Sequence, residues 1–384
     1  MYKVGITPCE NYEPSTVKES LERLLSSVGG LDFIKNGDTV VIKANLVSAM
    51  KPETAAVTHP KVIAALCDVL HEKGAKVIVG DSPGGLYNAA FLNHVYAVSG
   101  IREVTEHNAV LNNDFSTKSV YFDDAVMLKS FEYTAYLDKA DHIINFCKLK
   151  SHGMMGMSAA AKNMFGVIPG ITKPQYHYRF PDHKDFADML VDINEYFKDK
   201  VRLNIIDAVI AMEGNGPTQG TPKKVGALIA SQNPHAADLL AAELIGLNVN
   251  DLPMLKSAFL RGLIPETASQ LDINGDHKVF IQNDFETVSI KGILFEGNGQ
   301  SKFKRFVSKF LGSVLKTEPR LKRKDCVGCN VCGNICPAKA ITMKKGKAVI
   351  EKSKCIRCFC CQEFCPKGAM KVHRTFVSRI VEKL

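Results

Sequence analysis

Short apolar runs alternate with helical patterns through the first 300 residues of the chain. The runs of strand length are 1–8, 39–43, 76–80, 142–146, 203–207 and 225–230. Helical spacing predicts one helix from the N-cap residue Thr58 to Gly74 and another from Pro234 to Gly246. Because strands that alternate with helices form mainly parallel sheets, we expect an α/β body over residues 1–300. Such sheets bind ligands beyond the carboxyl ends of their strands, which predicts a ligand cleft at that edge.

Polar side chains gather where four of these predicted strands end. They are Lys43 and Asn45, Asp81 and Ser82, then Asn145, Lys148, Lys150, His152, Lys162 and Asn163, and finally Asp207, Glu213 and Asn215. Lysines that converge favour an anionic ligand such as a carboxylate or a phosphate. The candidate catalytic residues are Lys148, Lys150, His152 and Lys162, because lysine or histidine with a shifted pKa can donate or accept a proton. The other nine are candidate ligand-binding residues.

Each of these residues also fits an ordinary structural role when taken alone. A lysine at a strand end is commonly solvated, a lone histidine commonly lies at the edge of the core, and Gly-Asn-Gly-Pro at 214–217 is typical of a turn. Cys147 is expected to be a small buried residue, with a reactive thiol as the alternative. The glycine-rich segment 80–85 lacks the pattern of a P-loop or of a dinucleotide-binding loop, so the sequence identifies no flavin or nicotinamide site.

A different pattern occupies the end of the chain. Nine of the twelve cysteines lie between Cys326 and Cys365, and the spacing C-x2-C-x2-C-x3-C-P occurs twice, at 326–337 and 355–366. Cysteines this dense in a cytosolic chain indicate metal binding and not disulfides. The spacing resembles the bacterial-type ferredoxin signature, in which three thiolates of one run and the fourth of the other bind each cluster. Structural zinc sites are the alternative, although they need neither the third cysteine nor the Cys-Pro end.

Two 4Fe-4S clusters are therefore predicted, in a small α+β ferredoxin domain over residues 325–371. The ligands of one are Cys326, Cys329, Cys332 and Cys365, and those of the other are Cys355, Cys358, Cys361 and Cys336. Helices are expected to begin after each Cys-Pro, at 338–341 and 367–370. Cys360 lies outside the pattern and is expected to be either a bystander or a spare ligand.

Charge divides the chain near the same place. Residues 301–384 carry 21 Lys and Arg against 5 Asp and Glu, a formal charge of +16, so the +9 of the whole chain leaves −7 for residues 1–300. The basic end favours docking to an acidic surface, either on the body or on a redox partner protein. Its lysines are not interleaved with aromatic residues in a nucleic-acid-binding motif, so we expect no nucleic acid as a partner.

Amphipathic segments flank the cysteines. Residues 301–324 are predicted to form a basic linker helix whose apolar stripe packs on the rest of the protein or lies on an anionic membrane, with 320–324 as solvated linker. A similar stripe predicts a C-terminal helix over 372–384. No apolar run is long enough to span a membrane, and the N-terminus has no signal-peptide pattern, so we expect a cytoplasmic protein. With 46% hydrophobic and 23% charged residues, the composition excludes a disordered or fibrous chain.

Over residues 1–300 the chain resembles the family catalogued as domain of unknown function 362, many members of which carry a C-terminal ferredoxin module. The matching segments are 80–85, 145–152, 162–166, and Asp207 with 213–217. The family often has Lys-Pro-Asn where this chain has Lys43-Ala44-Asn45. The resemblance implies an iron–sulfur protein with a redox role, and it supplies no reaction.

Three functions are consistent with these features. An oxidoreductase would pass electrons from the two clusters to an anionic ligand in the cleft, with lysine and histidine supplying protons. Organic two-electron reductions usually need a mediator, so a second cofactor that the sequence does not identify stays open. A ferredoxin-type electron carrier would dock to a partner without catalysis of its own. A redox sensor or cofactor-maturation factor is the third alternative. We favour the oxidoreductase.

Overall fold

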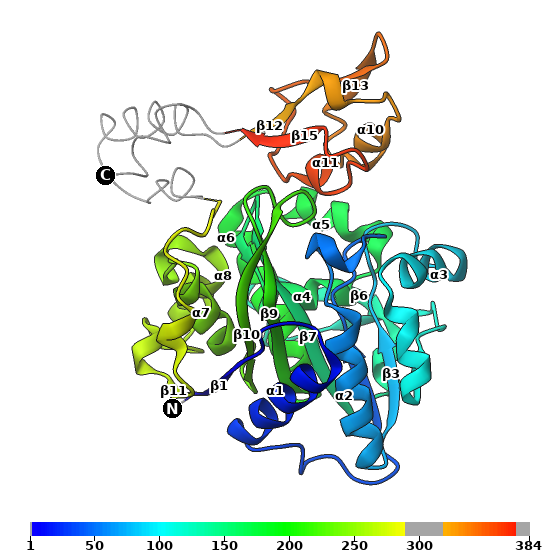
Figure 1. The fold of residues 1–384 in the computed structure, drawn as a ribbon. Helices are drawn as coiled ribbons and strands as arrows, with labels where there is room; N and C mark the ends of the chain where they lie inside the picture. Colours follow the sequence, from blue (N-terminus) through cyan, green and yellow to red (C-terminus); the bar gives the residue numbers. More distant parts are fainter. Residues whose placement is uncertain (1, 289–317, 374–384) are drawn as a thin grey trace.

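A nine-stranded sheet forms the centre of the body in the computed structural model, which describes residues 2–288 and 318–373 (Figure 1). Its strands are β1 (Lys3–Pro8), β2 (Thr39–Lys43), β3 (Lys76–Gly80), β4 (Ala109–Leu111), β7 (His142–His152), β8 (Gly156–Ser158), β9 (Val201–Glu213), β10 (Thr221–Ser231) and β11 (Asp272–Asn274). They lie in the order β11-β1-β10-β9-β7-β2-β3-β4, and β8 pairs with β7. β10 is antiparallel to β1 and β9, and β8 to β7, whereas the other neighbours are parallel. The mainly parallel α/β class is therefore confirmed.

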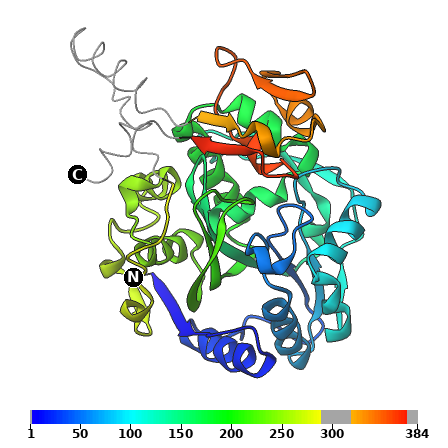
Figure 2. The same ribbon diagram turned by 45° about the horizontal axis from the view of Figure 1, so that its top comes forward.

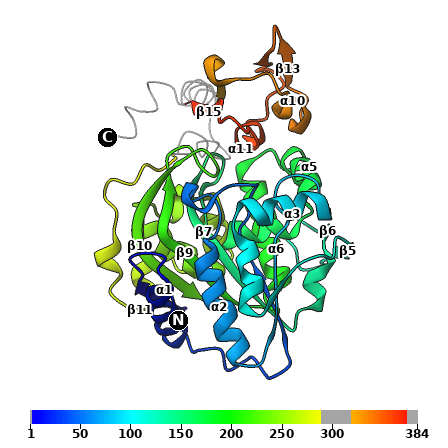
Figure 3. The same ribbon diagram turned by 45° about the vertical axis from the view of Figure 1, so that its right-hand side comes forward.

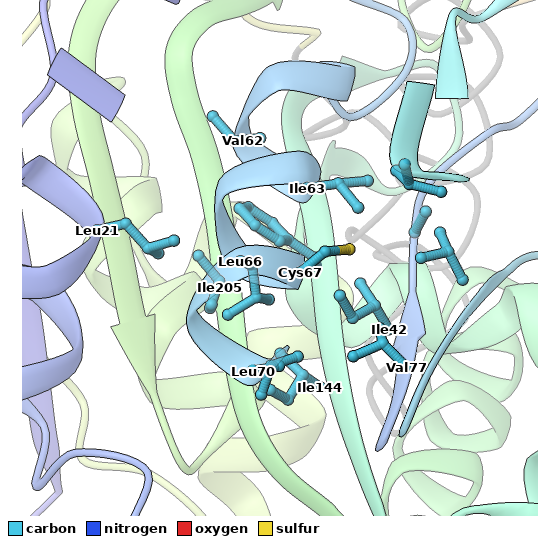
Figure 4. Close-up of a cluster of buried hydrophobic side chains, with 14 of the residues drawn as sticks. Leu21, Ile42, Val62, Ile63, Leu66, Cys67, Leu70, Val77, Ile144 and Ile205 are labelled. Atoms are coloured by element: carbon cyan, nitrogen blue, oxygen red, sulfur yellow. The ribbon is translucent and has the colours of Figure 1, made fainter. Parts of the chain in front are cut away.

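Helices cover both faces of this sheet. The body contains α1 (Pro14–Ser27), α2 (Pro60–Glu72), α3 (Ala89–Val98), α4 (Ala160–Asn163), α5 (Lys173–Arg179), α6 (His183–Phe197), α7 (Pro234–Leu244) and α8 (Pro253–Leu260). Successive side chains of a strand point to opposite faces. In β7, Ile144 and Phe146 join the core under α1 and α2, whereas Cys147 and Leu149 join the core under α7. Figure 4 shows the first of these cores, with Leu66 and Leu70 of α2 lying over Ile144 and Ile205 of the sheet.

The two predicted helices lie where their patterns placed them, although one N-cap differs. Asn233 caps α7 and the helix ends at Leu244, near Gly246. In α2 the N-cap is His59 and not Thr58, and Pro60 takes the first helical position. The Thr58 hydroxyl is engaged elsewhere: it donates to the Phe146 carbonyl oxygen at 2.9 Å and accepts from the Asn45 amide at 3.0 Å. Thr58 therefore connects the loop after β2 to β7.

Two strands are longer than their apolar runs predicted. β7 continues past Phe146 to His152, and β9 continues past Asp207 to Glu213, so the prediction that these strands end at 146 and 207 is wrong. In β7, Lys148 and Lys150 interrupt the apolar pattern, yet they are buried with partners inside the protein. In β9 the buried Asp207 is the interruption, and residues 208–212 are apolar again. The two backbones keep pairing with each other. Because β2 ends at Lys43, opposite Asn145, the far half of β7 extends past the edge of its neighbour.

The C-terminal module has its own small sheets. β12 (Glu318–Leu321) pairs with β15 (Met370–His373), and β13 (Ile341–Lys344) pairs with β14 (Lys347–Ile350). Two short helices, α10 (Val331–Ile335) and α11 (Cys360–Glu363), lie within the cysteine runs. Outside both groups, β5 (Thr117–Tyr121) pairs with β6 (Ser130–Thr134) in the body.

Several predictions for this end of the chain are corrected. The stretch 320–324, expected as solvated linker, is exposed apart from the half-buried Leu321, but it begins inside β12, because its backbone pairs with β15. The segments 338–341 and 367–370 lead into strands β13 and β15 and do not start helices. The remainder of the predicted linker helix, up to residue 317, and residues 374–384 of the predicted C-terminal helix lie outside the described residues. Among 2–288 and 318–373, no helix has both the length and the apolar character that crossing a membrane needs.

The module rests on the carboxyl-terminal edge of the sheet, above α5 and the turn between β9 and β10 (Figures 1 and 2). Asn215 in that turn accepts from the Gln362 side chain at 2.8 Å through its backbone oxygen, and from the Val372 amide at 3.0 Å through its side chain. Phe359 is buried in one apolar cluster with body residues. A methyl group at Gly84 would collide with the Phe364 ring, so only glycine permits this approach.

Candidate functional site

One pocket lies between the body and the module, beyond the ends of β2 and β3. Its empty volume is about 590 Å³ including the mouth. We call it the interface pocket. The body contributes Asn45, Val47, Asp81, Ser82, Pro83, Gly84, Lys150, His152, Ser158, Lys162, Asn163, Phe165, Gly166, Lys173, Pro174, His177 and Pro217, and the module contributes Cys360, Glu363 and Phe364. The pocket therefore brings candidate residues of the body against the second cysteine run.

Two lysines in the pocket, Lys150 and Lys173, each make two hydrogen bonds and have one N–H donor left for a ligand. Lys150 Nζ donates to Asn45 Oδ1 at 2.8 Å and to the Ala56 carbonyl oxygen at 2.7 Å. Lys173 Nζ donates to the Ile168 carbonyl oxygen at 2.7 Å and also to that of Ser82. An ammonium group has three N–H donors, so each lysine keeps one for a ligand. Burial lowers the pKa of both lysines to about 7.

Lys162, in α4, is a buried amine without a polar partner. Its side chain makes no hydrogen bond and no ion pair with any residue that the structure describes, and its Nζ lies 4.9 Å from the centre of the Phe165 ring. Burial lowers its pKa, and the negative charge of Glu363 acts in the opposite direction. The carboxylate of Glu363 has the same opposing effect on Lys150 and Lys173. An anion in the pocket would supply the partner that Lys162 lacks.

His152 offers the pocket a neutral hydrogen-bond donor. Its Nδ1 accepts from the backbone amides of Met154 at 3.1 Å and Met155 at 3.2 Å, which assigns the proton of the neutral ring to Nε2. Nε2 is buried and has no partner in the described structure. Burial and then the charge of Lys162 hold the pKa of His152 well below its usual range. The ring is therefore neutral near pH 7 and can donate to a ligand oxygen without carrying charge.

Behind these side chains, a buried polar network fixes the pocket wall. Lys43 Nζ lies 2.7 Å from Asp81 Oδ1, and Asp81 Oδ2 accepts from the Leu46 amide at 2.8 Å. A side chain at Gly166 would strike this ion pair, so glycine is required there. Asn163 accepts from Asn45 at 2.8 Å and donates to Asn145 at 2.7 Å. Lys43 and Asn145 therefore do not line the pocket themselves but hold lining residues Asp81 and Asn163 in position.

Four candidates lie elsewhere. Lys148 and Asp207 form a fully buried ion pair at 2.8 Å, joined by the Tyr12 hydroxyl, on a part of β7 and β9 that does not line the pocket. Glu213 accepts from the Glu286 amide at 2.9 Å, and Asn215 binds the module. These contacts give all four a structural explanation.

The pocket also contains residues that sequence reasoning missed. They are Lys173, His177, Cys360, Glu363 and Phe364. His177 is stacked on Phe186 with ring centroids 4.4 Å apart, and its Nδ1 has no partner in the described residues. Of these residues, Glu363 alone could have been noticed in the sequence, because it is an acidic side chain inside a cysteine run of a strongly basic segment.

The two cysteine sets are each gathered in one neighbourhood. Cys326, Cys329, Cys332 and Cys365, the first set, line one cavity. In the second set, Cys336, Cys355, Cys358 and Cys361, burial and then the charges of the other three thiolates raise the pKa of Cys361. All of these cysteines are free of disulfides. Four cysteine thiolates are the donor set that a 4Fe-4S cluster takes, so the residues of each set fit such a group.

Cys360 has a position that the spacing did not indicate. It is buried, it lies close enough to Cys358 of the second set for the two thiols to shift each other's pKa, and it lines the interface pocket. It therefore lies between a predicted cluster ligand and the ligand space of the body. Cys147, by contrast, is buried in the apolar core with a pKa raised by burial, as expected of a small buried residue.

Comparisons with known proteins agree with this division of the chain. The model of a domain of unknown function, DUF362, matches residues 40–243, and that of a 4Fe-4S dicluster domain matches 318–366. A thylakoid-associated protein of Synechocystis is 31% identical over 290 residues, which cover 71% of this chain and 84% of that protein. The dicluster match supports an iron–sulfur electron-transfer role, and the other two give no catalytic function.

Two solved structures are more distantly similar. Lactate racemase apoprotein from Thermoanaerobacterium thermosaccharolyticum has a TM-score of 0.39 and 12% identity, covering 61% of this chain and 55% of its own. A protein from Thermotoga maritima has a TM-score of 0.35 and 15% identity, covering 56% and 54%. The chain thus spans about half the length of these structures, and their low TM-scores carry no functional argument. From the family models and the Synechocystis relative, the chain belongs to the DUF362 family and carries a C-terminal 4Fe-4S dicluster domain.

Proposed function

We propose that the protein is an iron–sulfur oxidoreductase that reduces or oxidises a small anionic ligand in the interface pocket. The first and second cysteine sets would each hold one 4Fe-4S cluster, and bound clusters supply electrons one at a time. The observation that carries the proposal is the make-up of the pocket: unpartnered Lys162 and His152 of the body face Cys360 and Glu363 of the module. A ligand there would touch both the acid–base groups and the cluster-binding run.

The pocket residues would share the work of binding and proton transfer. Lys150 and Lys173 would hold a carboxylate or phosphate group through their remaining N–H donors. Lys162 and the Nε2–H of His152 would stabilise negative charge on a ligand oxygen as it develops. Lys162 can also release a proton more readily than an exposed lysine, because burial lowers its pKa. Phe165, Pro83 and Phe364 exclude water from part of the wall.

Anaerobic purification of the full chain tests this proposal. We expect about eight irons per chain, as two clusters require. Dithionite-reduced protein, freed of excess reductant, should then be reoxidised by at least one reducible anion from a panel of 2-oxo and α,β-unsaturated carboxylates, and mass spectrometry of denatured protein would identify any second cofactor. If no member of the panel binds or reoxidises the protein, an electron carrier without its own catalysis is the better assignment. Fewer than about four irons, with zinc in their place, would exclude the clusters.

Anion binding in the pocket is expected to weaken as the pH rises from about 6 to about 8. Lys150 and Lys173 have pKa values of about 7, so both are positively charged below that pH and lose their charge above it. Each lost proton removes an attraction, which lowers the affinity by up to about tenfold per pH unit for each lysine. Sulfate is the suitable probe because its own charge is constant in this range. Calorimetric titration at several pH values measures the effect, and a flat profile would place the binding elsewhere.

A further inference from the structure

The two cysteine sets differ in what surrounds them. In the second set, Cys358 and Cys361 are buried, and α11, which contains Cys361, is the helix of the module nearest the body (Figures 1 and 3). Burial lowers the pKa of the body residue His183, and the charge of Arg357, beside Cys358, adds to this, so the loop lies near the body. Through Cys360 the second set adjoins the interface pocket. The second set is therefore the inner one.

The loop 326–329, which carries two cysteines of the first set, faces away from the body, whereas Cys365 of this set lies near it and its carbonyl oxygen accepts from Gln219 at 3.4 Å. Cys329 is exposed, and Val327 beside it is 62% exposed. The turn of the β13–β14 hairpin lies against this loop, since Gly346 contacts Gly328 and Lys347 Nζ donates to the Cys326 carbonyl oxygen. In Figure 3, β13 lies on the side of the module remote from the body. The first set is therefore the outer one.

Unpaired basic side chains surround this outer loop. Arg323, Lys324, Lys344 and Lys345 are exposed, and none forms an ion pair within the described part of the chain. The carboxylates of the described module either form ion pairs with other lysines, as Glu318, Asp325 and Glu351 do, or line the pocket, as Glu363 does. These four basic residues around Val327 and Cys329 form what we call the basic face.

We infer that the basic face is the docking site for an acidic, one-electron carrier protein, so that electrons enter at the first cysteine set and leave from the second. The inference rests on the proposed function, in the case where the ligand in the pocket is reduced. A reduced carrier loses one electron at each encounter and the group held by the first set gains it. Two encounters, with two protons from solvent, balance one two-electron reduction in the pocket.

A protein fits this surface better than a nucleic acid or a membrane. Transient redox complexes combine charge attraction with a small apolar contact over the electron-transfer group, and Val327 beside Cys329 offers such a contact. The aromatic rings of the described module, Phe359 and Phe364, point toward the body, so no ring on this face can stack on a base. A single exposed valine supplies too little apolar area for insertion into lipid.

Charge reversal on the basic face tests the inference. We would compare the K324E/K345E variant with K35E/K76E, which makes the same change in net charge at the opposite edge of the sheet. Both control lysines are exposed: Lys35 precedes β2, and Lys76 is the first residue of β3. The probe is an acidic flavodoxin. Its oxidised form measures affinity by calorimetry, and its hydroquinone measures the rate of cluster reduction. Iron content must be equal in all three proteins.

Flavodoxin binding to the wild type should weaken as ionic strength rises, because salt screens the attraction. The K324E/K345E variant should bind and accept electrons at least about tenfold more weakly at low salt, and K35E/K76E should match the wild type. Equal effects of the two variants, or no effect of either, would overturn the inference and leave the ligand-driven reoxidation of the proposed function untouched. Loss of binding to phosphatidylglycerol vesicles alone, with flavodoxin reduction unchanged, would make the face a membrane site and also overturn it.

Discussion

Replacing Lys162 with Met is expected to abolish most anion binding while stabilising the ligand-free protein. Lys162 is 9% exposed and has no hydrogen-bond or ion-pair partner in the described structure, so folding removes most of the water around its side chain and supplies no polar partner in exchange. Methionine keeps the volume and removes that cost, which should raise the free energy of unfolding by about 1–2 kcal/mol. The bound anion loses a charge-assisted hydrogen bond worth about 2–4 kcal/mol, which corresponds to about 30- to 1000-fold in Kd.

Lys150→Met is the matched comparison in the same pocket. Lys150 also binds the anion in our proposal, but it satisfies Asn45 Oδ1 and the Ala56 carbonyl oxygen. Its loss leaves two buried acceptors unpaired, which should destabilise the protein by about 1–3 kcal/mol. Anaerobic urea denaturation followed by circular dichroism, together with sulfate calorimetry, separates the two cases. If Lys162→Met destabilises the protein as much as Lys150→Met does and leaves sulfate binding intact, Lys162 is a structural residue and the proposed site loses its main support.

Local patterns in the sequence were sufficient to predict the central parallel strands of the body. The apolar runs at 39–43 and 76–80 coincide with β2 and β3, because a buried parallel strand needs apolar side chains on both faces. The same rule failed for β7 and β9. Lys148 and Asp207 are as thoroughly buried as their apolar neighbours, and their mutual ion pair makes this possible, but a pairing across 59 residues has no local signature.

The residues of the interface pocket could likewise be predicted only in part, because some of them come together through contacts between distant parts of the chain. Asn45, Asp81, Lys150 and His152 could be selected because parallel strands bring their ends to one edge. Glu363 and Cys360 could not be selected from the sequence, because they line the pocket only where the module docks on the body. That docking is set by contacts such as Gln362 with Asn215 and Phe364 with Gly84, between residues well over one hundred positions apart. Spacing grouped the cysteines but did not say which set faces the body.

Lys148→Met is expected to have the largest effect on stability, about 3–5 kcal/mol, with little effect on anion binding. The substitution removes one member of a fully buried ion pair and leaves the Asp207 carboxylate charged in the core. Asp207 would keep the Tyr12 hydroxyl at 2.9 Å and the His59 amide at 3.1 Å, which cannot replace a positive charge. The same denaturation experiment measures the loss. Sulfate calorimetry on the folded variant should return the wild-type Kd, because Lys148 does not line the pocket.

The double variant Lys148→Met/Asp207→Leu distinguishes an uncompensated charge from damage to packing. With both charges gone, no ion is left unpaired, and apolar side chains of similar volume should restore most of the lost stability. Tyr12 limits the recovery, since its hydroxyl loses both Lys148, at 2.7 Å, and Asp207. A double variant no more stable than Lys148→Met would show that the pair is needed for the geometry of β7 and β9. A Lys148→Met protein with wild-type stability and weakened sulfate binding would contradict this prediction. Lys148 would then have to be a ligand-binding residue, because removing an amine that contacts the anion lowers the affinity without breaking a buried ion pair.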